Sequence, residues 1–323
     1  MQRIFHTPEG VRDIYSQECS RKQKLQEKLH RVFHQYGFED IETPTFEYFE
    51  VFSKEVGTIP SRELYKFFDR EGNTLVLRPD FTPSVSRACA TYFNPEKEVV
   101  SLCYTGNTFI NNSSFRGRLK ETTQMGVERM GDDSPEADAE ILAMTVECLL
   151  ATGLTEFQVS VGQVDYYKAI FAQTGMSQEE EEELRELISQ KNYFGVEELV
   201  KNKNMDKSLA RVLSQLPQMF GSTEVLEKAK SLTDNPQALK AVARLEEIYE
   251  LLKVYGYEKY VFFDLGLLSK FHYYTGIIFQ AYTYGTGEPI VKGGRYDALL
   301  QHFGKKAPAI GFCTVMESLM NAL

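Results

Sequence analysis

The sequence lacks any uninterrupted apolar run close to the roughly 18 residues that a membrane-spanning helix requires, and it opens without the apolar stretch of a secretory signal. Its five cysteines are odd in number, widely spaced and never arranged as Cys-x-x-Cys. This pattern argues against a disulfide framework and against a cysteine zinc site. We therefore interpret the cysteines as reduced core thiols and expect a cytoplasmic protein with no membrane partner.

Positive charge is also scarce. The chain carries 36 Lys and Arg against 46 Asp and Glu, a formal net charge of −10, so no overall field attracts a phosphate backbone or an anionic membrane. A tRNA partner would need a local basic patch. The 323 residues are 42% hydrophobic and 25% charged, which is typical of a globular protein with a large core. The length indicates two domains, or one large fold that carries an insertion.

The pattern of apolar and turn residues predicts a mixed fold. Leu25, Leu29, Val32 and Phe33 recur at helical spacing within residues 16–36, and a second helix begins at Ser134-Pro135-Glu136. A hairpin is expected where residues 65–68 and 74–77 flank a Gly-Asn turn. Further strands are expected at 99–104, 119–127, 157–161, 260–265, 276–283 and 289–291. Because hairpins outnumber strand–helix–strand units, we predict an α+β fold with a mainly antiparallel sheet.

The composition changes near residue 166. From there to residue 257 the pattern is helical and polar, and Ser177 precedes a run of five glutamates that fits a capped helix start. We therefore predict a core formed by residues 1–165 and 258–323, interrupted by an all-helical insertion at 166–257.

His30 and His34 stand four residues apart on the first predicted helix and could share a metal ion. The glutamate of a His-Glu-x-x-His motif is missing between them. We interpret the pair as part of an ordinary helix face and predict no metal site.

Common nucleotide-binding and hydrolase motifs are absent. The sequence instead contains four short polar clusters on strand-like segments, at residues 77–83, 123–128, 272–276 and 292–297. Gln124 and Glu128 are four residues apart on a predicted strand, so they share one face of the sheet. Any one cluster alone is explained by structural roles, such as a tight turn at Gly293-Gly294 or core packing of Tyr273 and Tyr274.

Together, and in this order, the clusters resemble the catalytic core of histidyl-tRNA synthetase, a class II aminoacyl-tRNA synthetase. The resemblance begins at Pro8-Glu9-Gly10-Val11-Arg12-Asp13, continues through residues 37–44 and ends at Ala309-Ile310-Gly311-Phe312. It implies a six- or seven-stranded antiparallel sheet flanked by helices, a dimer, and a pocket on the sheet.

The resemblance also implies which residues would bind histidine. Asp80, Thr82 and Gln124 would accept hydrogen bonds from its ammonium group, while Glu128 and Tyr274, with Tyr273 beside it, would contact the imidazole ring. These residue types match the donors and acceptors of free histidine. The sequence does not identify the cation for the carboxylate, for which Arg116, Arg118, Lys270 and Arg295 are candidates.

The nucleotide half of the resembling pocket is altered. Three arginines that the family uses in adenylation fall on Ile110, Ser269 and Ser318, and the aromatic residue near the adenine falls on Thr122. A preorganised transition-state donor contributes about 2.7–4 kcal/mol, so losing three arginines predicts that adenylation is lost. The sequence also ends soon after the third motif, and from this we expect no anticodon-binding domain.

This combination resembles the regulatory subunits of ATP phosphoribosyltransferase, which are paralogues of the synthetase core. The resemblance implies a non-catalytic subunit without cofactor or metal, a self-dimer within a hetero-octamer that includes the short-form catalytic subunit, and histidine as feedback effector. Two alternatives stay open: a truncated enzyme that adenylates an amino acid, and a module that senses tRNA. Pyrophosphate exchange would identify the first and a gel shift with tRNA the second.

Overall fold

The computed structural model describes residues 5–53, 59–112, 119–203, 205–268 and 273–323. Its main sheet has the strand order β1-β5-β6-β12-β11-β10-β7-β9-β8. The strands are β1 (Glu39–Asp40), β5 (Val100–Phe109), β6 (Glu121–Met130), β7 (Phe157–Gln163), β8 (Phe220–Gly221), β9 (Val261–Asp264), β10 (Ile277–Thr283), β11 (Val291–Arg295) and β12 (Ala309–Val315). Every pairing from β5 across to β7 is antiparallel. The predicted α+β fold with a mainly antiparallel sheet is confirmed.

The sheet is wider than the six or seven strands expected, because short strands extend both edges. On one side β1 pairs with β5 in parallel. On the other side β9 pairs with β7 in parallel and β8 pairs with β9. The two-residue strands β1 and β8 show too little alternation of apolar and polar residues to be recognised from sequence, whereas β9 falls within the strand predicted at 260–265.

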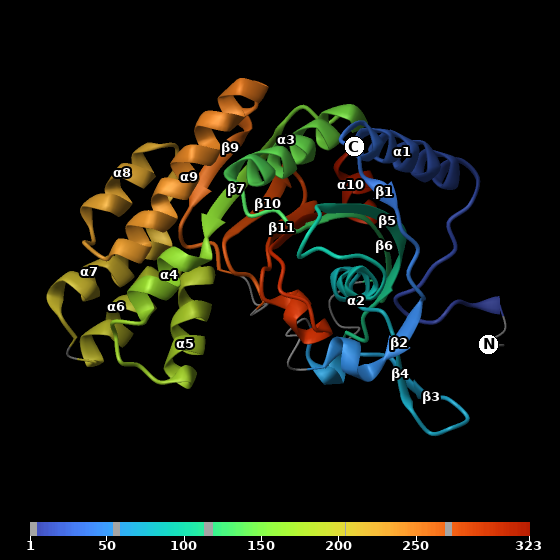
Figure 1. Ribbon diagram of the computed structural model, residues 1–323, viewed down its shortest axis with the longest axis horizontal. Coiled ribbons are helices and arrows are strands. Elements are labelled where there is room, and N and C mark those ends of the chain that lie inside the picture. The colour runs from blue at the N-terminus through green and yellow to red at the C-terminus, as the bar shows by residue number, and fades with distance from the viewer. Residues whose placement is uncertain (1–4, 54–58, 113–118, 204, 269–272) are drawn as a thin grey trace.

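Two helices cover one face of the sheet (Figure 1). The first, α1 (Ser16–Gln35), buries its helically spaced apolar side chains. The second, α3 (Pro135–Thr152), begins where the Ser134 hydroxyl accepts from the backbone N–H of Ala137 and ends at Gly153, whose φ is 101°. Proline in the first turn and a left-handed glycine at the end are the local signals that made this helix predictable. Both helices pack on the apolar side chains that β6, β7, β10 and β12 contribute to the largest core cluster.

The opposite face of the sheet carries α2 (Thr82–Tyr92), visible in Figure 1 within the curve of β5 and β6. The 3-10 helix η7 (Leu299–Phe303) packs beside it in a second apolar cluster. A smaller sheet, β2 (Phe46–Tyr48), β4 (Thr74–Leu77) and β3 (Lys66–Phe68), contains the predicted hairpin. The expectation that residues 77–83 are strand-like was wrong beyond Leu77, because Pro83 lies in the first turn of α2 and favours a helix start.

The polar segment after β7 forms a group of helices on one side of the molecule (Figure 1). They are α4 (Val164–Phe171), α5 (Gln178–Ser189), α6 (Tyr193–Asn202), α7 (Lys207–Gln215), α8 (Glu224–Ser231) and α9 (Pro236–Tyr255). The capping box at Ser177 is present. The segment is not all helical, because β8 joins the main sheet. Its separation from the core as an insertion at 166–257 stays a prediction.

The remaining elements are short. They are the helix α10 (Met316–Ala322) and the 3-10 helices η2 (Phe49–Phe52), η3 (Ser61–Glu63), η5 (Leu216–Gln218) and η6 (Glu258–Tyr260). Within the described ranges, no helix combines the length and the apolar character needed to cross a bilayer. All five cysteines are free thiols. Cys89, Cys103 and Cys148 are buried as expected of core residues, whereas Cys19 and Cys313 are only half-buried.

Candidate functional site

The candidate site is centred on Glu128, on the face of the sheet that carries α2. Side chains alternate along β6, so Gln124, Gly126 and Glu128 share this face while Met125 and Val127 enter the core beneath α1 and α3. Glu128 is 1% exposed. Directly opposite it on β12 stands Gly311, where an added Cβ would lie 1.9 Å from the Glu128 carboxylate. The glycine therefore provides the space that this carboxylate occupies.

Three hydroxyl groups donate hydrogen bonds to the Glu128 carboxylate. The hydroxyl of Thr82, at the start of α2, donates to Oε1 over 2.7 Å, and that of Tyr104 on β5 donates to the same oxygen over 3.4 Å. Tyr296 donates to Oε2. Because Thr82 gives its proton to Glu128, its own oxygen keeps lone pairs that can accept from a ligand.

A second carboxylate, Asp80, lies near enough to Glu128 for its charge to affect the pKa of Glu128. Its Oδ1 accepts from the backbone N–H of Phe81 over 2.8 Å, at the positive end of α2. Burial raises the pKa of Asp80 to about 6, and backbone hydrogen bonds and the charge of Lys292 partly oppose this. Burial likewise raises the pKa of Glu128 to about 8, with the Asp80 charge adding to the rise. Two carboxylates with raised pKa values form a site that favours a cationic ligand.

The tyrosine pair lies against the same region. The rings of Tyr273 and Tyr274 are 4.6 Å apart between centroids, and Tyr273 meets Tyr296 edge to face at 6.1 Å. Burial raises the pKa values of Tyr273 and Tyr274 well above that of free tyrosine. Gly294 leaves room for the Tyr274 ring, since an added Cβ would lie 2.7 Å from it. The two hydroxyls share a side-chain hydrogen bond, and both stay protonated at neutral pH.

Gln124 lies four residues before Glu128 on β6, on the same face of the strand. Its Oε1 is buried and has no hydrogen-bond partner among the residues that the structure describes. A buried amide oxygen without a partner costs roughly 1–3 kcal/mol, so a donor on a bound ligand would relieve this cost. The structure thus places Asp80, Thr82, Gln124, Glu128, Tyr273 and Tyr274 on one face of the sheet and its covering segments.

The described positions at which the sequence predicts lost adenylation residues lie on or beside several elements of the fold. Ile110 follows β5, and its N–H donates to the Lys120 carbonyl over 2.9 Å. Ser318 lies in α10. The hydroxyl groups of Thr122 and Thr108 form a hydrogen bond of 3.1 Å between their Oγ1 atoms. Ser269 lies outside the described residues, so its role stays a prediction.

Arg295 was a wrong candidate for the cation that meets a ligand carboxylate. It points to the helix-covered face, where Asp138 on α3 accepts from its Nε and Nη2 over 2.9 and 2.6 Å. The other three candidates, Arg116, Arg118 and Lys270, lie outside the described residues. Lys292, two residues from Gly294 on β11, faces the site, and within the described part of the chain it has no ion-pair partner. Its place in the 292–297 cluster was the only sequence signal for it.

Tyr104, Tyr296 and Gly311 were also missed as site residues. Tyr104 and Gly311 reach Glu128 through antiparallel pairings between distant segments, and no local pattern encodes that register.

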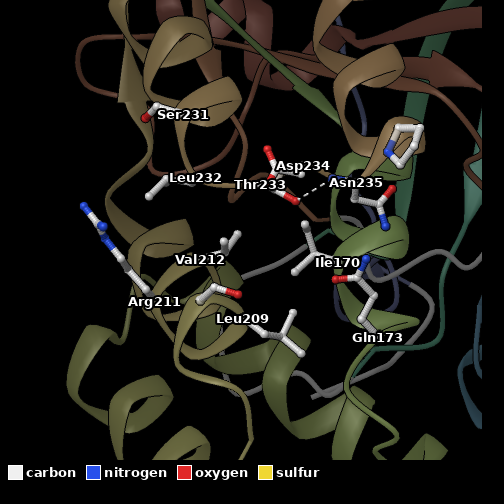
Figure 2. A pocket seen from close by; sticks show the side chains of 12 residues that line it. Ile170, Gln173, Leu209, Arg211, Val212, Ser231, Leu232, Thr233, Asp234 and Asn235 are labelled. Carbon is white, nitrogen blue, oxygen red and sulfur yellow. Dashed lines mark hydrogen bonds between the residues drawn. The ribbon is translucent and has the colours of Figure 1, made fainter.

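Several cavities of the described residues are lined by other side chains than this site, among them one of about 670 Å³ along α1. The one in Figure 2 has a volume of about 530 Å³ and is lined by α4, α7 and the α8–α9 connection. Figure 2 shows the Arg211 side chain directed away from the other labelled residues, so it offers no inward charge. A second cavity of about 670 Å³ separates the helical segment from β11. A third, of about 260 Å³, lies near Arg12 and Glu317.

The raised pKa of Glu128 predicts a pH dependence of stability. Folded protein retains a proton up to about pH 8 that an unfolded glutamate releases near 4.3. The free energy of unfolding should therefore fall as pH rises between these values. Asp80 acts in the same direction over a narrower range.

Urea unfolding at pH 5, 6.5 and 8 measures this effect. Across this range the free energy of unfolding of wild type should fall by up to a few kcal/mol relative to that of Glu128→Gln. Parallel profiles for the two proteins would contradict the assignment.

Comparison with known proteins first identifies the class. The sequence matches the histidyl-tRNA synthetase family over residues 10–319. A crystal structure of histidyl-tRNA synthetase from Nostoc sp. PCC 7120 is 22% identical and superposes with a TM-score of 0.82, covering 98% of this chain and 74% of that one. The chain has the fold of the catalytic core of histidyl-tRNA synthetase, a class II synthetase.

Closer similarity identifies the family. An ATP phosphoribosyltransferase regulatory subunit from Acetivibrio thermocellus is 42% identical over 319 residues, which cover 99% of this chain and 76% of that relative. A crystal structure described as an ATP phosphoribosyltransferase regulatory subunit/histidyl-tRNA synthetase from Bacillus halodurans C is 34% identical, with a TM-score of 0.91, and covers 99% and 83% of the two chains. The chain belongs to the family of ATP phosphoribosyltransferase regulatory subunits, and is not itself the catalytic subunit.

Proposed function

We propose that this chain binds the short-form catalytic subunit of ATP phosphoribosyltransferase, supports the first step of histidine biosynthesis, and makes that step sensitive to feedback inhibition by histidine. Relatives that are 42% and 40% identical carry the name of the regulatory subunit, which supports the catalytic partner. The cytoplasmic location and the hetero-octamer that contains a self-dimer are part of the same proposal.

The observation that carries the histidine proposal is a pair of carboxylates, half-buried Asp80 and buried Glu128, neither of which forms an ion pair with any residue that the structure describes. Asp80 and Glu128 have raised pKa values chiefly because they are buried, so each gains free energy from a positively charged partner. An α-ammonium group satisfies Asp80, and an imidazole N–H can donate to Glu128. The Oε1 of Gln124, which no described residue contacts by a hydrogen bond, accepts a further ammonium proton.

Lys292 completes the proposed site as the cation for the histidine carboxylate. It faces the site from β11, and its charge acts on Asp80. A free amino acid carries one ammonium and one carboxylate, so adjacent Asp80 and Lys292 match both charges. The ring groups, Glu128 and the tyrosines, then select the side chain.

Regulation requires that histidine binding and the catalytic subunit affect each other. Typical coupling free energies are about 1–3 kcal/mol, and the coupling is reciprocal. Calorimetric titration of histidine into the chain alone and into its complex should give affinities that differ by roughly 5- to 150-fold. Histamine, which lacks the carboxylate, should bind more weakly, and Lys292→Met should remove that difference.

Two outcomes would contradict the proposal. The absence of histidine binding with and without the catalytic subunit would remove the effector role. Histidine-dependent pyrophosphate exchange by the purified chain would instead assign it an adenylating activity, despite Ile110 and Ser318 at the arginine positions.

A further inference from the structure

Four side chains with metal-binding atoms converge at the edge of the main sheet, away from the candidate histidine site. They are His30 and His34 on α1, Asp40 on β1 and Cys103 on β5. Their ligand atoms all lie within 4.8 Å of one another. Figure 1 shows α1, β1 and β5 next to each other at this edge.

The chain path explains why these residues meet. His30 and His34 are one helical turn apart and present their Nε2 atoms to the same side of α1. After α1 the chain turns back at Gly37, whose φ of 78° favours glycine. The returning strand then pairs in parallel with β5, and Asp40 stands directly opposite Cys103. The sequence spacing of the histidines therefore shows only half of the cluster.

The Asp40 carboxylate accepts hydrogen bonds from the other three side chains of the cluster. Asp40 Oδ1 lies 2.6 Å from His30 Nε2 and 3.4 Å from Cys103 Sγ, while Oδ2 lies 3.0 Å from His34 Nε2. The two imidazole rings are only 4.1 Å apart between centroids. Such crowding of donors around a single anion leaves a central position at which a cation can replace the shared protons.

The donor set indicates the kind of cation. Two imidazole nitrogens, one carboxylate oxygen and one thiolate sulfur are a tetrahedral set for Zn²⁺ or a similar transition-metal ion, whereas Mg²⁺ and Ca²⁺ require mostly oxygen ligands. With bond lengths of about 2.0–2.3 Å, tetrahedral ligand atoms lie roughly 3.3–3.7 Å apart. The atoms already lie within 4.8 Å, so rotations of the side chains complete the geometry.

Access and closure also fit a bound ion. The side chains of His30, His34 and Asp40 are 40%, 46% and 57% exposed, so an ion can enter from solvent. Cys103 is buried and closes the inner side.

We propose that His30, His34, Asp40 and Cys103 bind one divalent transition-metal ion of the Zn²⁺ type, which fastens α1 and the edge strand β1 to β5. Cys103 ligates as thiolate, and its proton passes to solvent. The ion stabilises the edge of the fold and takes no part in histidine binding, since none of its ligands belongs to that site.

The test uses the untagged full chain, stripped of metal and titrated with CoCl₂ and ZnCl₂. One equivalent of Co²⁺ should give the visible bands of a tetrahedral ion and the near-ultraviolet band of a cobalt–thiolate bond, and Zn²⁺ should displace it. Cys103→Ser should lose the thiolate band, and His34→Ala should weaken Co²⁺ binding at least 100-fold. Saturating Zn²⁺ should raise the Tm of wild type but not of either variant.

Matched controls keep the test decisive. Cys19→Ser and His302→Ala remove the same residue types outside the cluster and should leave the spectrum unchanged. Far-ultraviolet circular dichroism of the metal-free variants verifies that they are folded. Binding that survives in the His34→Ala and Cys103→Ser double variant, a spectrum without a thiolate band, or no binding at all would overturn the assignment.

Discussion

Replacing Glu128 by glutamine should weaken histidine binding by about 10- to 150-fold, because one charge-assisted hydrogen bond contributes about 1.5–3 kcal/mol. The substitution keeps the shape of a side chain that is 1% exposed. Because Thr82 donates to Oε1 and Tyr296 to Oε2, the amide oxygen keeps one of these two acceptor positions, and the hydroxyl beside the amide nitrogen accepts instead of donating. Calorimetry measures the affinity of the chain alone. Inhibition assays with the catalytic subunit should show a matching loss of sensitivity to histidine.

The control for this experiment is Glu121→Gln on the same strand. Glu121 lies an odd number of residues from Glu128, so it faces the other side of the sheet, where it accepts from Asn107 over 2.6 Å. Its substitution should leave the histidine affinity unchanged. Complex formation, measured by light scattering, should be unaffected in both variants. If Glu128→Gln fails to assemble with the catalytic subunit, Glu128 has a structural role and the binding assignment is wrong.

Local signals in the sequence were sufficient for the main helices and for the face of one strand. The Ser134 cap and the periodic apolar residues of α1 act within a few residues of chain, and the alternation of β6 places Gln124 with Glu128. Such features depend on short-range geometry, so they are readable without knowledge of the fold.

The rest depended on contacts between distant segments. Tyr104 and Gly311 become neighbours of Glu128 only through the register of β5 and β12 on β6. Asp40 meets Cys103 through a two-residue parallel strand, too short to produce a pattern. Arg295 was misassigned because a cationic side chain near a polar cluster looks the same in sequence whichever face of the strand it occupies.

The position of Arg295 leads to the largest expected effect on stability. Arg295 is 3% exposed and Asp138 is 1% exposed. Two guanidinium nitrogens of Arg295 donate to Asp138, and its Nη1 donates to the Asp132 carbonyl over 3.0 Å. Arg244 on α9 donates to the second oxygen of Asp138 over 2.8 Å. This buried group therefore links β11, α3 and the helical segment.

Arg295→Met should lower the free energy of unfolding by about 3–5 kcal/mol, because it leaves a buried carboxylate with one partner. Urea unfolding measures the change. Removing both charges in the double variant Arg295→Met with Asp138→Leu should recover part of the loss, since replacing a buried ion pair by apolar groups is often neutral.

Arg12→Met is the matched control. The side chains of Arg12 and its ion-pair partner Glu18 are 44% and 40% exposed, so the loss of unfolding free energy should stay below about 1 kcal/mol. A loss for Arg295→Met as small as that of the control would show that water already reaches Asp138 and that the buried pair does not hold α3 to β11.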